Sequence, residues 1–319
     1  MAVMNLKAIS EAYQQTVPNK ARRTIRNILV ASVFVLPGMA VFFVFLLLPM
    51  IESVQFGFYK WDGLGPLQDY RGLDNYEKAF NHEVFRTAIT NSFRIMALSL
   101  LIQLPIAMSL ALMVGRGNLP GRRIFRLLLF LPYVFSEVIT ALIWRYVMHP
   151  TDGLLNWFLG HSVPGYDNVG WLADKDIAIY SVFIVLTWKY FGFYMILYMA
   201  GLQGVPKDLE DAARVDGANI VQVLSRITLP LMGSTIRLTV FLSVLGAFQQ
   251  FVLVWVLTGG GPVNASQIMG TYIYKFGIKS FNLGYGAAVA LILFAITLIF
   301  SIGYQRMILH QDFAGDISL

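Results

Sequence analysis

Long stretches without a single charged residue constrain this chain more than any other feature. Three of them are bounded by pairs of charged residues: 25 uncharged residues between Arg26 and Glu52, 21 between Arg94 and Arg116, and 26 between Lys279 and Arg306. A spanning helix needs roughly 20 apolar residues, and an ionisable group at the bilayer centre costs at least about 2.5 kcal/mol. These stretches therefore predict transmembrane helices.

The composition agrees with an integral membrane protein of the all-α class. Of 319 residues, 57% are apolar and 13% are charged, whereas soluble proteins average about 45–50% and about 25%. This length holds several spans and their loops but no large soluble catalytic domain. The absence of cysteine excludes disulfides, thiolate catalysis and cysteine-ligated metals.

We expect six spans in one permease domain over residues 27–308. The third and fourth spans carry Glu137, Arg145 and Lys189, but their length and apolar composition still favour a membrane or a buried bundle. The first span is too long for a signal peptide and is expected to remain as an anchor. The six predicted spans are about 28–51, 95–114, 127–148, 177–202, 238–257 and 283–305, with a long loop at 203–237 and end segments at 1–26 and 309–319.

The distribution of basic residues orients these spans. With the N-terminus in the cytoplasm, 14 of the 24 basic residues fall inside and eight fall outside, which agrees with the positive-inside rule. Both termini are therefore predicted to be cytoplasmic. The net charge of +6 is then explained by membrane orientation, and no nucleic-acid partner is implied.

The loop at 203–237 is patterned rather than merely polar. Pro206 followed by acidic residues is typical of a helix start, because acids there meet the positive end of the helix dipole. Gly217 supplies a turn, and a second amphipathic stretch runs over residues 220–227 to Pro230. The pattern predicts a short helix, a turn and a second helix on the cytoplasmic face. Such an element either docks a cytoplasmic partner or lies in the interface without one.

The spacing within this loop resembles a known signature. Asp211-Ala212-Ala213, three residues, Gly217, nine residues and Ile227-Thr228-Leu229-Pro230 are similar to the EAA signature of ABC importer permeases. The first position is aspartate instead of glutamate, which keeps the charge on a shorter side chain. The resemblance implies a coupling helix that contacts the ATPase through six residues: Asp211, Ala212, Ala213, Arg214, Asp216 and Gly217.

Other short motifs resemble the di- and oligosaccharide permeases of the maltose-transporter type. They occur in the family's order: Gly72-Leu73-Asp74-Asn75-Tyr76, Leu131-Pro132 with Trp144, Gly153-Leu154-Leu155-Asn156, and Leu257-Thr258-Gly259-Gly260-Gly261-Pro262. The glycine-rich motif resembles that of the larger maltose permease. This implies a second, different permease subunit and hence a heterodimer.

The resemblance also implies the remaining parts of the assembly. The fold would be that of a type I ABC importer permease in a bacterial or archaeal cytoplasmic membrane. Two cytoplasmic ATP-binding subunits and an extracytoplasmic sugar-binding protein are the expected partners. No Gly-Lys dipeptide occurs, which excludes a Walker A loop. We therefore expect no enzymatic activity and no cofactor on this chain, with ATP and magnesium on the partner ATPase.

Polar and aromatic residues within spans are the candidates for a substrate path. Gln249 and Gln250 are adjacent in the fifth span, about 100° apart on a helix, so at most one can face the pathway centre. Family resemblance favours sugar contact by these amides, and hydrogen bonding between helices is the alternative. Tyr190, Tyr194 and Tyr198 form one stripe on the fourth span, which suits either a sugar or helix packing; the family places substrate contacts on this span, and Tyr198 lies nearer the cytoplasm.

Glu137 is the only acid within any predicted span. Structural pairing with Lys189 or a partner subunit, acceptance of a sugar hydroxyl, and a proton relay are the three roles left open. Arg145 and Lys189 are expected to extend toward the outer surface. Glu137 is predicted to share one face of the third span with Tyr133, Ala141 and Trp144. The predicted substrate-binding residues are six: Gln249, Gln250, Tyr190, Tyr194, Glu137 and Trp144.

A self-sufficient secondary transporter or channel is the competing function. Six spans with one buried acid offer few ion sites, and the internal repeats of many such folds are not evident. Intramembrane protease motifs are absent as well, and all four histidines fall in predicted loops or tails. The sequence therefore favours the permease subunit of an ATP-driven sugar importer.

Overall fold

A computed structural model describes residues 20–116 and 120–315 of the chain. The predicted end segments, 1–26 and 309–319, lie partly outside these residues. The chain divides into two compact units, Met1–Gln55 and Phe56–Leu319.

The first unit is a long apolar helix. It comprises α2 (Lys20–Phe42), the π-helical turn η1 (Phe43–Leu47) and most of α3 (Leu48–Phe56). Residues Leu29–Phe56 are long and apolar enough to cross a membrane, and none of the most apolar window is buried. A helix that exposes apolar side chains in this way is suited to lipid or to a partner helix rather than to water.

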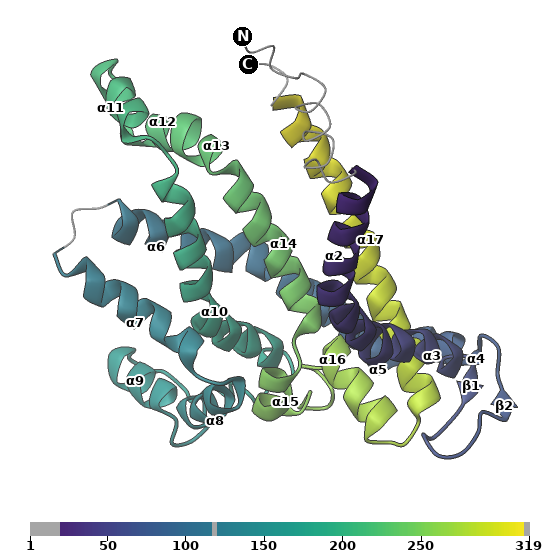
Figure 1. Ribbon diagram of the computed structural model, residues 1–319. Helices are drawn as coiled ribbons and strands as arrows, with labels where there is room; N and C mark the ends of the chain where they lie inside the picture. The colour runs from purple at the N-terminus through teal and green to yellow at the C-terminus, as the bar shows by residue number, and fades with distance from the viewer. Residues whose placement is uncertain (1–19, 117–119, 316–319) are drawn as a thin grey trace, which may run out of the picture. The chain divides into compact units, whose positions relative to one another are not determined.

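The second unit is built around α10 (Ala178–Gln203), which packs against α6 (Leu104–Gly115) and α7 (Arg122–Val134) (Figure 1). α10 carries apolar residues on all of its faces, and 14 of its 26 residues are buried. A helix that is hydrophobic all round belongs in the core. α10 therefore positions the elements around it.

The remaining elements extend from this core toward two opposite ends. α11 (Lys207–Val215), α12 (Ile220–Val223), η3 (Leu224–Thr228) and α13 (Leu229–Leu231) lie beyond one end of α10, and α8 (Glu137–Val147), α9 (Leu154–Ser162) and α15 (Val252–Thr258) lie at the other (Figure 1). The other helices are α4 (Asp74–Asn81), α5 (Glu83–Leu98) with η2 (Ser99–Gln103), α14 (Gly233–Gln249), α16 (Met269–Tyr272) with η4 (Ile273–Ile278), and α17 (Leu283–Gly315).

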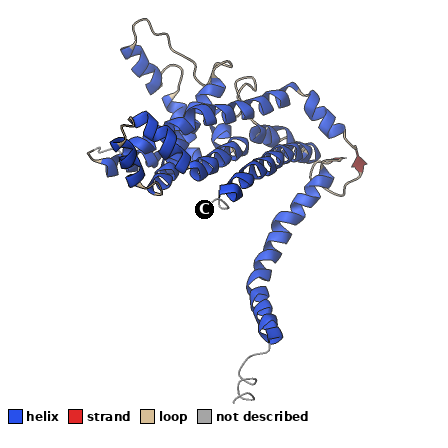
Figure 2. Cartoon of the chain, turned by 90° about the horizontal axis from the view of Figure 1, so that it is seen from above, coloured by secondary structure: helices blue, strands red, loops and turns tan. Residues whose placement is uncertain are grey.

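Helices dominate the described part of the chain, as the sequence predicts (Figure 2). The only strands in residues 20–116 and 120–315 are β1 (Tyr59–Lys60) and β2 (Asp69–Tyr70), which pair antiparallel with Tyr59 opposite Tyr70. Asn75 fixes this hairpin, because its side-chain amide donates to the carbonyls of Gly57 and Tyr59, each at 3.0 Å.

Four helices within the described residues are long and apolar enough to span a membrane. They are Leu29–Phe56, Glu83–Gly115, Ala178–Gln203 and Leu283–Ile308. Two bent pairs raise the number to six if each pair forms one span: Arg122–Val134 with Glu137–Val147, and Ile220–Leu231 with Gly233–Gln249. The helical, multi-span class is thereby confirmed.

The contact between α10 and α7 depends on a glycine. A Cβ atom at Gly192 would overlap the carbonyl oxygen of Leu129 and lie 3.0 Å from the Cα atom of Phe130. Both atoms belong to the backbone of α7 and cannot rotate away. The two helices therefore approach closely only because position 192 has no side chain.

We predict that Gly192→Ala lowers the stability of the purified transporter by about 1–3 kcal/mol, the usual cost of overpacking. Gly303→Ala is the matched control, because Gly303 also lies within a helix and a Cβ atom there meets nothing within 4 Å. This control is expected to be neutral or slightly stabilising. Thermal unfolding in detergent measures both, and equal melting temperatures for the two variants would contradict the prediction.

Candidate functional site

The third apolar stretch is broken into two helices. α7 ends at Val134 and α8 begins at Glu137, and the two helices meet at 99°. Between them, Phe135 has an extended backbone and Ser136 caps α8, its Oγ accepting a hydrogen bond from the amide of Ile139 at 3.2 Å. A serine N-cap of this kind begins a new helix instead of continuing the old one.

This break corrects the prediction that four residues share one helical face. Tyr133 lies in α7, whereas Glu137, Ala141 and Trp144 lie in α8. Pro132 precedes the break, and proline both lacks a backbone N–H and crowds the preceding turn. The single-face prediction is wrong because it continued one helical periodicity through this interruption.

Lys189 lies beside the broken end of α7. Its side chain is buried, with 4% of the residue exposed, and Nζ donates to the carbonyl oxygens of Phe135 at 2.6 Å and Tyr133 at 3.4 Å. The last carbonyls of a helix lack internal partners, and a cation there also meets the negative end of the dipole. The prediction that Lys189 extends toward the outer surface is therefore wrong, while Arg145 is exposed.

Glu137 accepts a hydrogen bond from the phenol group of Tyr190. The hydroxyl of Tyr190 donates to Glu137 Oε1 at 2.6 Å, and within the described residues no ion pair of 4.0 Å or less joins Glu137 to Lys189. The carboxylate also stands in the first turn of α8, where the helix dipole favours negative charge. An acid among apolar helices is thus accommodated by a helix start and one short hydrogen bond.

A cavity of about 170 Å³ lies next to this pair, between α5, η2, α7, α10 and α14. Its polar lining combines phenol, hydroxyl and amide groups, and its remaining walls are apolar. The lining residues are Ile95, Ser99, Gln103, Tyr133, Leu186, Tyr190, Phe193, Tyr194, Leu242, Ser243, Gly246, Ala247 and Gln250. Such a mixture of apolar walls and a few convergent polar groups is typical of small-molecule sites.

Three of the six predicted substrate residues meet in this cavity: Tyr190, Tyr194 and Gln250. Gln250 Oε1 is buried and has no hydrogen-bond partner among the described residues, which leaves an acceptor in the wall. Gln249 is exposed and does not line the cavity. The two amides diverge because α14 ends at Gln249 and Gln250 leaves the helix.

Glu137 and Trp144 stand outside the lining. Glu137 instead reaches the cavity through its bond to Tyr190. Sequence reasoning missed Ser99, Gln103 and Ser243, which supply further polar groups. All three are polar residues within predicted spans. The criterion that selected Gln249 and Gln250, a polar side chain inside a span, would have selected them too.

The patterned loop forms a short helix, a turn and a second helix. Between α11 and α12, Gly217 has a φ of +86°, a conformation that side chains rarely tolerate. Asn219 caps α12 and exchanges two hydrogen bonds with Gln222, at 2.8 and 2.9 Å. The arrangement explains why a glycine and a capping residue follow α11 closely.

The six residues of the predicted coupling surface all lie on α11 or in the turn after it. Five are exposed: Asp211, Ala212, Arg214, Asp216 and Gly217, whereas Ala213 is half-buried. Arg214 pairs with Asp211 at 3.1 Å on the exposed face. A small, charged and accessible surface is thus present at this end of the molecule.

Glu210 attaches α11 to the rest of the second unit. Its buried carboxylate pairs with Arg116 at 3.2 Å and accepts a hydrogen bond from the hydroxyl of Thr228 at 2.9 Å. Arg116 also donates to the carbonyls of Leu202 and Val205, at 3.0 and 2.9 Å. Sequence reasoning treated Glu210 only as one of the acids at the helix start. Its role as an anchor depends on contacts from α6 and η3.

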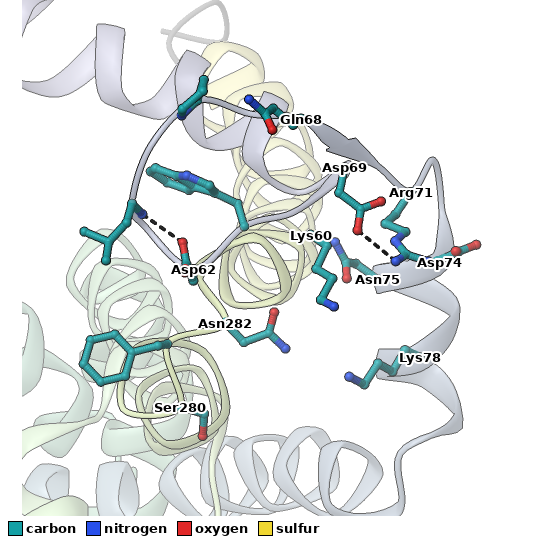
Figure 3. Close-up of a pocket in the computed structure, with 14 residues that line it drawn as sticks. Lys60, Asp62, Gln68, Asp69, Arg71, Asp74, Asn75, Lys78, Ser280 and Asn282 are labelled. Carbon is teal, nitrogen blue, oxygen red and sulfur yellow. Dashed lines mark hydrogen bonds and ion pairs between the residues drawn. The ribbon is translucent and has the colours of Figure 1, made fainter.

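A larger hollow of about 620 Å³ opens at the other end, beside β1 and β2. Figure 3 shows Lys60, Lys78 and Asn282 directed toward the same open space. Asp69 pairs with Arg71 at 2.8 Å on the rim. The hollow is therefore polar and carries two lysines for which no carboxylate lies within 4.0 Å among the described residues.

Comparison with known proteins identifies the class. The family described as "Binding-protein-dependent transport system inner membrane component" matches residues 103–309, and the chain belongs to this family. It is 32% identical over 280 residues to the probable ABC transporter permease protein YurN of Bacillus subtilis, covering 87% of this chain and 95% of YurN.

Two further relatives carry names that specify a sugar. The chain is 31% identical over 278 residues to the trehalose/maltose transport system permease protein MalF of Thermococcus litoralis, covering 86% of this chain and 91% of MalF. A chain of a bacterial alginate ABC transporter, solved with an alginate pentasaccharide-bound periplasmic protein, matches with a TM-score of 0.79 at 26% identity, covering 91% of this chain and 97% of that one. The resemblance to ABC importer permeases is confirmed, and the secondary-transporter alternative is excluded. The protein is a multi-pass membrane permease subunit.

We predict that Tyr190 and Glu137 are energetically coupled. A hydrogen bond to a charged group contributes about 1.5–3 kcal/mol, so the effects of Tyr190→Phe and Glu137→Ala on stability should be non-additive by about that amount. Chemical unfolding of the single and double variants measures the coupling. Tyr190→Phe combined with Arg145→Gln is the control pair and is expected to be additive within about 0.5 kcal/mol. Additivity in both pairs would contradict the prediction.

Proposed function

We propose that this subunit imports a di- or oligosaccharide and that the cavity beside Tyr190 belongs to the sugar path. The observation that carries the proposal is the juxtaposition of Tyr190, Tyr194 and Gln250 in one cavity. Tyrosine rings suit the apolar C–H patches of a sugar, and amides and hydroxyls suit its rim of hydroxyl groups. The names of the trehalose/maltose and alginate relatives support a sugar as the cargo.

Six spans with both termini in the cytoplasm are part of this proposal. α7 with α8 would then form one span and α14 would supply another. α11 and α12 would lie on the cytoplasmic side with the excess of basic residues. A broken span beside a midplane cavity is a recurrent way to build a transport site, because the interruption frees polar groups within the apolar layer. The break between α7 and α8 supports this arrangement.

We expect Gln250→Ala to weaken sugar-stimulated ATPase activity of the reconstituted transporter about 5- to 10-fold at low sugar concentration, the loss of one hydrogen bond. Gln249→Ala is the matched control and should stay within twofold of the wild type, because that side chain is exposed away from the cavity. Maltose and trehalose, each with the cognate binding protein, serve as probes. Equal loss in both variants, or none in either, would discard this cavity as the sugar site.

The surface around α11 is proposed to dock a cytoplasmic ATPase. Glu210 holds α11 against α6 and η3, so movement of α11 would be transmitted to the helices that follow. ATP binding would bring the coupling helices together and turn the permease from inward-open to outward-open, and hydrolysis would reset it. Two ATP-binding subunits, a second permease and an extracytoplasmic binding protein complete the proposed assembly. The binding protein would meet the hollow that contains Lys60 and Lys78 (Figure 3).

Val215 provides a direct test of docking. It is 87% exposed at the end of α11, so Val215→Glu should leave the fold intact and reduce co-purification of the ATPase at least about tenfold, as expected for a central interface residue. Gly217 is a poorer probe because its positive φ would strain any side chain.

Val263→Glu is the control for Val215→Glu. Val263 is 88% exposed but follows α15 at the opposite end of the second unit, so this variant should retain the ATPase at the wild-type level. Undiminished ATPase in the Val215→Glu preparation would exclude docking at α11.

A further inference from the structure

A basic cavity lies where the C-terminal ends of α6 and α10 meet the beginnings of α7 and α11. Its volume is about 460 Å³. Buried apolar residues of α10 and of the turn after it line this cavity, together with four cationic side chains. The cations are Arg116, Arg122, Arg126 and Lys207.

Only one of these cations is neutralised within the described part of the chain. Arg116 pairs with Glu210 at 3.2 Å. Arg122, Arg126 and Lys207 have no carboxylate within 4.0 Å among the described residues. Arg126 Nε is moreover buried without a hydrogen-bond partner there. A donor in this state is costly unless something else satisfies it, so the cavity is built for an anion from outside.

The surroundings favour an anion that also carries apolar chains. α7 is part of a bent pair that is apolar enough to span a membrane, and beyond its first turn it exposes Leu127 to 65% and Leu128 to 56%. The basic cavity therefore stands at the polar end of an apolar helix. A phospholipid matches this arrangement, because its charged headgroup would meet the basic cavity and its acyl chains would meet the apolar surface of α7.

We propose that this cavity binds the phosphate headgroup of an anionic phospholipid. The guanidinium groups of Arg122 and Arg126 would each present paired N–H donors to the phosphate oxygens, with Lys207 as a further positive charge. Basic pockets between helices at the membrane surface are suited to such headgroups. Because Pro206 and Lys207 also lead into α11, a bound lipid would brace the start of this helix. That effect on coupling rests on the proposed docking role of α11, whereas lipid binding does not.

The test counts bound lipid on the complete purified transporter by native mass spectrometry. Delipidated complex is titrated with phosphatidylglycerol, with phosphatidylcholine, and with glycerol 3-phosphate as the soluble phosphate. The variants are Arg122→Gln with Arg126→Gln, and Arg123→Gln as the control, because Arg123 is exposed on the same helix and does not line the cavity. Each charge removed is expected to weaken phosphatidylglycerol binding about 5-fold, hence about 25-fold for the double variant. Arg123→Gln should bind as the wild type does.

Several results would overturn the proposal. Equal loss in Arg123→Gln would indicate general surface charge, and equal affinity for glycerol 3-phosphate would indicate a soluble anion. Binding to the permease subunits alone but not to the complete transporter would identify the ATPase as the occupant of the cavity. If the double variant aggregates, Arg122→Gln alone, with its exposed side chain, is expected to lose about 5-fold. Lipid is counted without transport, so failure of the sugar or docking proposals would not alter this result.

Discussion

A helix that is interrupted within an apolar layer must satisfy the backbone groups that the interruption frees, because lipid offers them no partner. The second unit meets this requirement at one point with a buried lysine. Lys189 donates to the carbonyls of Phe135 and Tyr133 at the end of α7, while Ser136 caps the beginning of α8. Without these two partners the turn between α7 and α8 would expose unpaired polar groups in the interior of the bundle.

The candidate site follows from this turn. Because α8 begins at Glu137, the carboxylate stands at a helix start, where it meets the positive end of the dipole, and it lies within 2.6 Å of the Tyr190 hydroxyl. Lys189 and Tyr190 are consecutive on α10. Lys189 therefore donates to the free carbonyls at the end of α7, while Tyr190 donates to the carboxylate of Glu137. Of this hydrogen-bonded pair, Tyr190 lines the cavity, and Gln250 lines it as well.

Much of the architecture could be predicted from the sequence because charge is expensive in lipid. The uncharged stretches located the long helices, and the glycine, proline and acid pattern around α11 predicted a helix, a turn and a second helix. The interruption after Pro132 and the end of α14 at Gln249 could not be predicted in this way, because an apolar stretch resumes directly after each of them. The expected single face through Tyr133 and Glu137, and the expected outward path of Lys189, failed for that reason.

The same limit applies to the acids of α11. Asp211 and Glu210 are adjacent in the sequence, and the family signature draws attention to Asp211, which is exposed and pairs with Arg214 on its own helix. Glu210 faces inward and pairs with Arg116, the residue that follows α6. These two residues are 94 positions apart, so no local sequence pattern indicates their contact. This pair neutralises one positive charge at the basic end of the bundle, whereas the other three cations around the neighbouring cavity have no carboxylate within 4.0 Å in residues 20–116 and 120–315. One buried ion pair therefore both fixes α11 to the membrane helices and defines which charges remain available to an anion beside it.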